Sequence, residues 1–398
     1  MIDLFDKHKG IADRFSRMMT LGVNALGLTN DQVISPTRAM IDGRETILAG
    51  TNNYMGITLD ADCIKAGQDA MANFGTGTTG SRIANGSYGL HVQLEAELAK
   101  FLNRKHCIVF TTGYQANLGM MSGLAGPKDT IFLDSDSHSS IYDGCTLSGA
   151  KLVRFRHNDA ADLEKRMLRS EGEDGGKLVV VEGIYSMLGD RAPLKDFVDL
   201  KKRHGFQLLA DEAHSFGVLG PHGRGLADEA GLEDDVDFVV GTFSKSVGAI
   251  GGFGAGNHPM FETLRYAMRP YMFTASSSPA SIATSLAAVR KLAAEPERRD
   301  KLRANSARLF EGFRALGLDM GCDVVSPVIA VKCADEISTI TMWNALIESG
   351  VYVNIALPPG TPNKLCLLRC SVSAAHSFDD IDKIIALFGK VVKTKAAA

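Results

Sequence analysis

Three side chains in the sequence have types and positions that suit one kind of covalent chemistry. Asp211 and His214 come directly after the apolar run 206–210, and Lys245 follows a second apolar run, 237–243. A lysine at the end of a buried strand can form a Schiff base with an aldehyde, and a carboxylate can keep a proton on a pyridine nitrogen. The three residues therefore fit an active site that holds an aldehyde cofactor.

The residues around Lys245 add a phosphate-binding element to this pattern. Thr242, Ser244 and Ser246 surround the lysine, and glycines follow it. Hydroxyl groups and backbone amides are common donors to phosphate oxygens. A single lysine or aspartate is more often a solvated surface charge, but Asp211 and Lys245 both end apolar strands. The combination indicates a pyridoxal 5′-phosphate site.

The stretch Asp211–His214 also spells D-E-A-H, the letters of a nucleic-acid helicase motif. A helicase driven by ATP needs a phosphate cradle of the pattern G-x-x-x-x-G-K-[ST] ahead of that motif. The segments 175–178 and 388–391 contain Gly-Lys, but neither continues with serine or threonine. The net charge is −3 and no basic block is present. Nucleic acid is therefore not an expected partner.

The composition is that of an ordinary soluble globular protein of 398 residues, 45% hydrophobic and 22% charged. The seven cysteines are scattered and form no C-x-x-C pair, which predicts reduced thiols and no metal site. Residues 1–10 lack the apolar core of a signal peptide, and no apolar run reaches the roughly 20 residues that span a bilayer. We expect a cytoplasmic protein.

The middle of the chain alternates short apolar runs with amphipathic stretches. Helical spacing is found at 159–171 and 193–205. The expected strands are 107–113, 130–136, 151–155, 177–183, 206–214 and 237–245. Such alternation predicts a mainly parallel α/β sheet covered by helices, and ligands bind such sheets at the carboxyl ends of their strands.

The C-terminal part has a different pattern. Segment 281–317 predicts long helices, segments 324–333 and 364–373 predict strands, and a further helix is expected near 380–392. This pattern is typical of a smaller α/β domain. We therefore predict three parts: an N-terminal arm at 1–45, a large cofactor-binding domain at 46–280 and a small domain at 281–398.

Ten segments match, in register, the pattern of a known family. They are Asn53–Gly56, Gly75–His91, Thr111–Gly119, Asp136–Cys145, Val153–Asp159, Glu182–Asp190, Asp211–Gly225, Gly241–Gly248, Arg269–Ser276 and Leu367–Ser371. The sequence resembles the α-oxoamine synthases, pyridoxal phosphate enzymes of fold type I, over nearly the whole chain. Within that family the segments look most similar to the soluble bacterial serine palmitoyltransferases. The resemblance implies a large domain with a mainly parallel seven-stranded sheet and a smaller C-terminal α/β domain.

The resemblance also implies roles for the residues around the cofactor ring. Lys245 would form the Schiff base, Asp211 would pair with the pyridine nitrogen, and His214 would bond the ring hydroxyl oxygen. His138 would stack on the ring face, although a histidine beside serines is more often a capping residue. These four residues are the ones that the family pattern marks as catalytic.

Phosphate binding is implied in the same way. The family pattern assigns phosphate contacts within the subunit to Gly113, Tyr114, Thr242 and Ser244. Thr274 and Ala275 would reach the phosphate of the neighbouring subunit, because the family builds its site at a dimer interface. The resemblance therefore implies a homodimer.

Substrate contacts are implied for Asn53 and Arg369. The guanidinium of Arg369 would hold the substrate carboxylate as a bidentate fork. The sequence departs from the family at one position, because relatives often carry an arginine directly before a Pro-Pro pair that here follows Leu357. That arginine has a part in handling the carboxylate, so the departure leaves the amino-acid substrate less certain than the cofactor.

The implied reaction is a decarboxylative condensation of L-serine with a long-chain acyl thioester of the palmitoyl-CoA type. The product would be 3-ketodihydrosphingosine, in the first step of sphingolipid synthesis. The acyl chain length, and the choice between coenzyme A and acyl carrier protein as donor, stay open. A lipid product leaves room for a transient contact with a membrane surface during its release.

Two kinds of alternative remain. Within the family, the substrate could be alanine or glycine, as in 8-amino-7-oxononanoate synthase, glycine C-acetyltransferase or 5-aminolevulinate synthase. From another class, the chain could be a non-catalytic regulatory subunit with the same fold, but such a subunit is expected to lack the Schiff-base lysine. The presence of Lys245 favours an enzyme.

Overall fold

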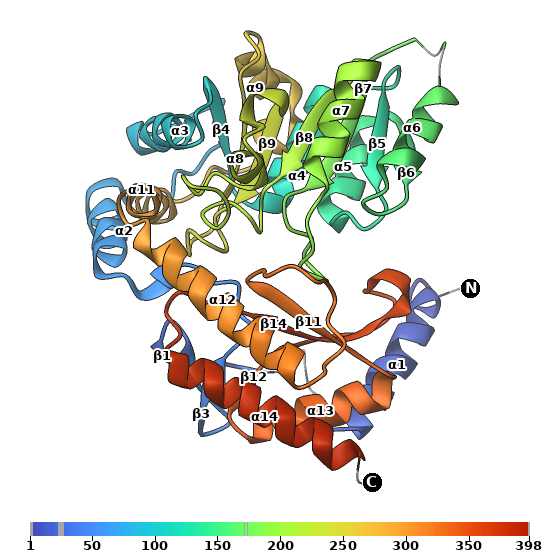
Figure 1. Cartoon of the computed structure of the whole chain (residues 1–398). Helices are drawn as coiled ribbons and strands as arrows, with labels where there is room; N and C mark the ends of the chain where they lie inside the picture. Colours follow the sequence, from blue (N-terminus) through green and yellow to red (C-terminus); the bar gives the residue numbers. More distant parts are fainter. Residues whose placement is uncertain (1–2, 23–27, 171, 173, 397–398) are drawn as a thin grey trace.

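The computed structural model describes residues 3–22, 28–170, 172 and 174–396. Figure 1 shows two bodies, one built around a large sheet and the other around smaller sheets that combine both ends of the chain. Within the described residues, no helix is long and apolar enough to cross a membrane.

The large sheet has seven strands in the order β4-β10-β9-β8-β7-β5-β6. Its strands are β4 (His106–Phe110), β5 (Thr130–Asp134), β6 (Lys151–Phe155), β7 (Lys177–Glu182), β8 (Gln207–Asp211), β9 (Phe238–Thr242) and β10 (Gly252–Gly256). The pairs from β6 to β9 are parallel, and β10 runs antiparallel to both of its neighbours. The mainly parallel seven-stranded sheet is thus confirmed.

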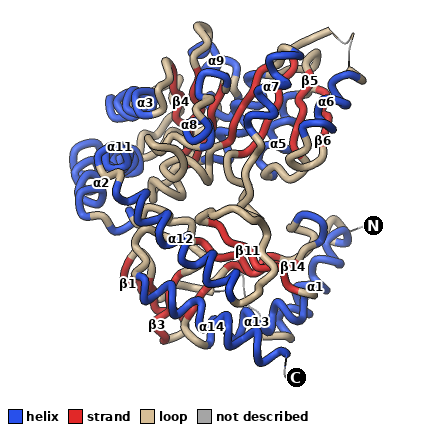
Figure 2. Tube along the Cα trace, in the orientation of Figure 1, coloured by secondary structure: helices blue, strands red, loops and turns tan. Residues whose placement is uncertain are grey.

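Helices cover both faces of this sheet, as Figure 2 shows. They are α2 (Ala61–Phe74), α3 (Gly89–Phe101), α4 (Gly113–Leu124), α5 (Ser139–Ser148), α6 (Ala160–Leu168), α7 (Leu194–His204), α8 (Leu226–Ala230), α9 (Leu264–Ala267), α10 (Arg269–Met272) and α11 (Pro279–Ala294). Short 3₁₀ turns are η2 (Ile57–Leu59), η3 (Glu233–Asp235) and η4 (Phe261–Thr263). Along β7, Val179 and Val181 join one core, which includes Phe197 of α7, whereas Leu178 and Val180 join the other. The continuous apolar runs of the sequence therefore arise because each strand is buried on both faces.

The six strands expected from the sequence are all present, and β10 is the one that the sequence analysis missed. Three of its five residues are glycines, which β-propensity disfavours. Their small size is required by packing: a Cβ on Gly252 would lie 2.7 Å from Cα of Gly113, and one on Gly254 would lie 2.4 Å from the sulfur of Met120. The glycines let α4 lie close against the sheet.

The second body contains both ends of the chain. Its strands are β1 (Gln32–Ser35), β2 (Arg38–Ile41), β3 (Arg44–Leu48), β11 (Val328–Cys333), β12 (Val351–Tyr352), β13 (Asn354–Ala356) and β14 (Cys366–Ser371). Its helices are η1 (Asp6–His8), α1 (Lys9–Thr20), α12 (Glu297–Ala315), α13 (Glu336–Glu348), η5 (Pro362–Lys364) and α14 (Phe378–Ala396). The sheets have the orders β1-β2-β3-β12 and β11-β14-β13.

The N-terminal strands are not isolated from the rest of the chain. β3 pairs with β12 in parallel, so residues 44–48 share a sheet with residues 351–352. At the predicted boundary at residue 280, helix α11 packs against α2 and α3 (Figure 1). The division at residues 45 and 280 stays a prediction.

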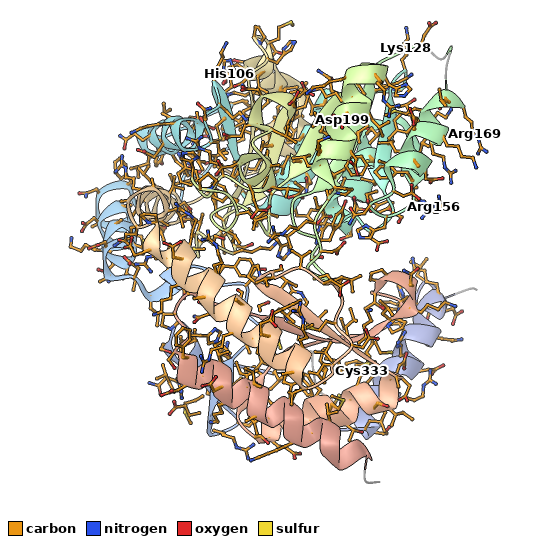
Figure 3. All side chains as sticks on the ribbon, in the orientation of Figure 1. His106, Lys128, Arg156, Arg169, Asp199 and Cys333 are labelled. Carbon is orange, nitrogen blue, oxygen red and sulfur yellow. The ribbon has the colours of Figure 1, made fainter. Side chains whose placement is uncertain are left out.

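The carboxyl ends of the parallel strands face the second body. In Figure 3, the labelled Arg156, which follows β6, lies on the side toward that body, and Lys128, which precedes β5, lies at the opposite end. The polar residues that end β7, β8 and β9 therefore meet at the junction of the two bodies, where α/β sheets bind ligands.

Candidate active site

A cavity of about 320 Å³ lies at this edge of the sheet. Eight of the residues singled out in the sequence line it: Gly113, Tyr114, His138, Asp211, His214, Thr242, Ser244 and Lys245. The register of the strands brings them together, because Glu182 pairs with Asp211 and Asp211 pairs with Val240. Segments far apart in the sequence thus contribute to one site.

Lys245 presents its amine to this cavity. Burial lowers the pKa of Lys245 to about 8, against the opposing effects of Asp211 and Glu182, while Arg369 lowers it further. A lysine in such surroundings carries a share of neutral amine near neutral pH, and the neutral amine is the nucleophile. The geometry therefore supports a Schiff-base role for Lys245.

Asp211 is buried and held in place by N–H donors. Its Oδ2 accepts a hydrogen bond of 2.7 Å from Nδ2 of Asn117, and its Oδ1 accepts one of 2.9 Å from the backbone amide of Ala213. The neighbouring Glu182 is also buried, and burial together with Asp211 raises the pKa of Glu182 well above its usual value. Glu182 is therefore favoured as a neutral acid beside Asp211.

His214 is neutral, and its tautomer is set by Tyr54. Burial and the nearby Lys245 lower the pKa of His214 well below its usual value. Nδ1 of His214 lies 2.7 Å from the hydroxyl oxygen of Tyr54. Burial raises the pKa of Tyr54 to about 12, so the phenol keeps its proton. Its contact with Nδ1 is shorter than its 3.2 Å contact with Oδ1 of Asn52, so we assign the hydrogen bond from the phenol to Nδ1. Nε2 of His214 then carries the hydrogen and can donate to a ring oxygen.

His138 combines the capping role and the cavity role that the sequence suggested. As the N-cap of α5, its Nδ1 accepts a hydrogen bond of 3.2 Å from the amide of Ser140. Its own backbone amide donates to Oε1 of Glu182 at 2.5 Å. Burial lowers the pKa of His138, so the ring is favoured as a neutral, flat surface facing the cavity.

The N-terminus of α4 forms an anion site beside these residues. Thr112 caps the helix by accepting a hydrogen bond of 3.1 Å from the amide of Gln115, and Gly113 begins the helix. A Cβ on Gly113 would lie 2.6 Å from Cβ of Thr242, so this position requires glycine. The hydroxyls of Thr242 and Ser244 lie 2.9 Å apart at the same place. Helix amides and hydroxyls that converge in this way suit a phosphate.

Tyr114 lies at the start of α4, and its role toward a phosphate stays a prediction. It lines the cavity, but 44% of it is exposed and its hydroxyl donates to a carboxylate oxygen of Asp143. Ala213 also lines the cavity, and its small side chain leaves room for a flat ring. An enclosed lysine, a held carboxylate, a donor histidine and a phosphate cradle together fit pyridoxal 5′-phosphate.

Arg369 lies beside this cavity, on β14. Its Nε donates to the carbonyl of Ser186 at 2.5 Å, and Nη1 donates to Oδ1 of Asn52 at 3.2 Å and to Oγ of Ser371 at 3.0 Å. Only 5% of the residue is exposed. The guanidinium is thus fixed in one orientation, and its charge lowers the pKa of Lys245.

Three further predicted residues, like Arg369, lie outside the cavity lining. Asn53 shapes a turn: its Nδ2 donates to Oγ1 of Thr58 at 2.8 Å, and its Oδ1 accepts from the amide of Ile57 at 3.1 Å. Thr274 accepts a hydrogen bond of 3.1 Å from Gln115 and, like Ala275, lines a separate small pocket. Their roles toward substrate and the neighbouring subunit stay predictions.

Sequence reasoning missed three residues of the site: Asn117, Glu182 and Tyr54. All three lie at or within segments that carried the family resemblance. Asn117 follows Gly113 by four residues, one helical turn, and so shares its face of α4. Glu182 ends its strand as Asp211 does, which is a signal that the sequence analysis could have used.

Comparisons with known proteins agree with this geometry. The family model described as "Aminotransferase class I and II" matches residues 44–388. The chain is 53% identical to serine palmitoyltransferase of Caulobacter vibrioides over 388 residues, 98% of this chain and 96% of the relative. It is 37% identical to 8-amino-7-oxononanoate synthase of Symbiobacterium thermophilum, over 89% of this chain and 90% of the relative.

A solved structure gives the same result for the fold. The structure of serine palmitoyltransferase with pyridoxal phosphate as the internal aldimine superimposes with a TM-score of 0.97, at 46% identity, and the match covers 100% of both chains. The expected fold type I architecture is therefore confirmed, and this chain belongs to the class I and II aminotransferase family of pyridoxal phosphate enzymes.

Proposed function

We propose that this chain is a pyridoxal 5′-phosphate-dependent acyltransferase that condenses L-serine with a long-chain acyl thioester. The observation that carries the proposal is the convergence of Lys245, Asp211 and His214 in one cavity beside a phosphate cradle. Relatives called serine palmitoyltransferase are 48% and 53% identical, whereas the 8-amino-7-oxononanoate synthase of Symbiobacterium thermophilum is 37% identical. The serine reaction is therefore favoured over the other condensations of the family.

The cofactor, when bound, supplies an electron sink for negative charge that develops at the substrate Cα. Asp211 would hold a proton on the ring nitrogen, since its oxygens are already oriented by Asn117 and Ala213. Nε2 of His214 would donate to the ring oxygen, in the tautomer that Tyr54 enforces. The neutral ring of His138 would cover one face of the cofactor and exclude water from it.

Lys245 would accept the proton from the substrate Cα. Its pKa of about 8 matches the requirement that a general base be partly neutral at the working pH. Arg369 would hold the substrate carboxylate through charge-assisted hydrogen bonds. The bonds from Arg369 to Ser186 and Asn52 orient the guanidinium before substrate arrives, which lowers the entropy cost of binding.

The presence of Lys245 in the cavity argues against a purely regulatory subunit. We further propose that the active unit is a homodimer in which Thr274 and Ala275 contact the phosphate in the partner's site. In the single chain these residues lie in a pocket separate from the cavity of Lys245, which suits a role toward another subunit. We place the reaction in the cytoplasm, which agrees with the scattered cysteines of the sequence and the lack of any C-x-x-C pair.

Product masses test the proposed reaction. Purified protein, with pyridoxal 5′-phosphate and palmitoyl-CoA, should be incubated with L-serine, L-alanine or glycine in separate reactions. The expected outcome is a dominant product with the mass of 3-ketodihydrosphingosine from serine. Faster turnover of alanine or glycine would assign the chain to a different member reaction. A parallel reaction with palmitoyl-acyl carrier protein in place of palmitoyl-CoA would identify the preferred thioester.

A further inference from the structure

A second cavity, of about 420 Å³, lies between the two bodies and shares no lining residue with the active-site cavity. One wall comes from the large-sheet body, with Arg191 and the segment 218–220. The other wall comes from α12 and the segment 323–327, which leads into β11. The volume is in the range of pockets that bind small ligands.

The floor of this cavity contains a buried cation. Arg299 is 6% exposed, and its guanidinium donates to the backbone carbonyls of Leu292 at 2.8 Å and Pro221 at 3.1 Å. Burial lowers the pKa of Arg299, and the charges of Asp300 and Asp228 offset this effect only in part. Across the described ranges, no carboxylate forms an ion pair with it. A buried charge without a counterion is costly, so an anion in this cavity would be stabilised.

A second polar group lines the same cavity and has no partner. Ser306 is 2% exposed, and among the residues that the structure describes its Oγ has no hydrogen-bond partner. Arg299, Arg303 and Ser306 are spaced at i, i+4 and i+7 on α12, so they share one face of that helix. The orphaned hydroxyl therefore lies on the face that carries the buried guanidinium.

The other charges at the cavity are balanced or exposed. Arg191 bonds a carboxylate oxygen of Glu229, and its Nη2 donates to the carbonyl of Val325 at 2.9 Å. Arg303 pairs with Asp300 at 3.2 Å near the solvent. Asp323 is exposed at the rim, where water screens its charge. The lining thus contains three arginines and two acids, Glu229 and Asp323, a net charge of +1.

The remaining walls are apolar. They are formed by Val218, Leu219, Leu302, Val324, Val325 and Pro327. An apolar wall next to a guanidinium that has no carboxylate partner suits a ligand with an anionic head and an apolar body. We infer that this cavity is a second binding site, for a small carboxylate with a short aliphatic chain, and that its occupant holds the two bodies together.

Calorimetric titration of the cofactor-loaded protein with sodium octanoate tests this inference. We expect saturable binding at one site per chain and a rise in the unfolding temperature, because a ligand that bridges both bodies stabilises the native state. Two further probes separate the contribution of the ligand's anionic head from that of its aliphatic chain. Inorganic phosphate lacks the chain and 1-octanol lacks the charge, and each should bind at least about tenfold more weakly than octanoate.

Two rim variants locate the bound octanoate. Val324→Trp, at a position that is 48% exposed, should fill the mouth of the cavity and abolish binding. Arg303→Glu should weaken binding about tenfold by placing a negative charge at the rim. The matched controls are Ile337→Trp, at an exposed position of α13, and Arg314→Glu, which sits on α12 in a similar pair with Glu311 at 3.1 Å. Both controls should bind octanoate as the parent protein does.

Four outcomes would overturn the inference. They are no saturable binding at octanoate concentrations below roughly 1 mM, unchanged binding by Val324→Trp, phosphate binding as tight as octanoate binding, and octanol binding as tight as octanoate binding. Unchanged binding by Val324→Trp would place the octanoate elsewhere, for example where an acyl substrate binds. Product formation from serine is measured separately, so failure here leaves the proposed reaction untouched.

Discussion

The hydroxyl oxygen of Tyr54 lies 2.7 Å from Nδ1 of His214, across 160 residues of sequence. The same hydroxyl lies 3.2 Å from Oδ1 of Asn52, which accepts hydrogen bonds from Arg369. Tyr54 therefore joins His214, which lines the cavity, to the residue that is proposed to hold the substrate carboxylate. Its phenol has a single proton, and the shorter contact assigns that proton to His214.

Tyr54→Phe should lower kcat while leaving the fold intact. The change removes the donor that fixes the tautomer of His214, a loss of about 1–2 kcal/mol, or roughly tenfold in rate. Steady-state kinetics and the absorption spectrum of the bound cofactor measure the effect. Tyr352→Phe is the control, because the hydroxyl of Tyr352 bonds Asn354 at 2.8 Å in the second body. Equal effects of the two changes would show that Tyr54 has no special role.

Lys245 should be the residue that borohydride links to the cofactor. Peptide mass mapping after reduction should find the modification on Lys245, and Lys245→Ala should bind the cofactor without turnover. Burial lowers the pKa of Lys245 to about 8, so the rate of cofactor incorporation into cofactor-free protein should rise with pH through a midpoint near 8. A solvated lysine would give a midpoint near 10.4. Modification of another lysine would contradict the assignment.

Arg369→Ala should severely weaken serine binding while the spectrum of the cofactor without substrate stays normal. Removing one partner of a buried charge pair costs about 2–5 kcal/mol. Spectral titration with L-serine measures the change. Arg369→Lys should recover part of the serine affinity, since lysine keeps the positive charge but lacks the two parallel donors of the guanidinium. Unchanged affinity in Arg369→Ala would mean that the carboxylate binds elsewhere.

Leu357→Arg tests the departure from the family pattern. Leu357 lies directly after β13, the strand that pairs with the strand of Arg369, and it is partly buried. The apolar side chain of Leu357 cannot help Arg369 to bind the substrate carboxylate, because it donates no hydrogen bond. We therefore expect Leu357→Arg to be tolerated, with serine affinity equal to or tighter than that of the parent protein. A loss of serine affinity in the same titration would place this position outside the carboxylate site.

His157 bridges two acids near the strand ends. Its Nδ1 lies 2.8 Å from Oδ1 of Asp134, and its Nε2 lies 2.6 Å from Oδ2 of Asp190. Burial alone would lower the pKa of His157, but these hydrogen bonds raise it to about 10. Asp134, Asp136 and His157 have the donor spacing of a metal site, but both ring nitrogens of His157 are already engaged by Asp134 and Asp190. The cluster is therefore best described as an ion-pair network.

The network predicts a pH dependence of stability. An unfolded histidine titrates near 6.5, so the stabilisation from His157 is fully present below pH 6.5 and is lost as the pH rises toward 10. His157→Gln should cost roughly 3 kcal/mol at pH 6 and much less at pH 10. Urea unfolding at both pH values measures this. His222→Gln, whose side chain is 59% exposed, is the control and should change little. A pH-independent cost for His157→Gln would contradict the ion-pair account.

Much of the site could be predicted because its residues sit next to strong local signals. Asp211, Thr242 and Lys245 follow continuous apolar runs, and such runs mark strands that are buried on both faces. Gly113 follows another apolar run and begins a helix, which is a local signature of an anion site. Site residues next to a strand end or a helix start can be recognised in a single sequence. The backbone geometry there depends on only a few adjacent residues.

Other features depended on contacts between distant segments. The glycine-rich β10 is a strand because β4 and β9 hydrogen-bond to it on both sides, although its own residues disfavour strands. The bond from Arg369 to Asn52 joins residues 317 positions apart, and the second cavity combines Arg191, Arg299 and Val324. No periodicity links such positions. Their meeting is decided by how the helices and sheets pack, because side-chain burial and partners are properties of the assembled core and not of the local chain.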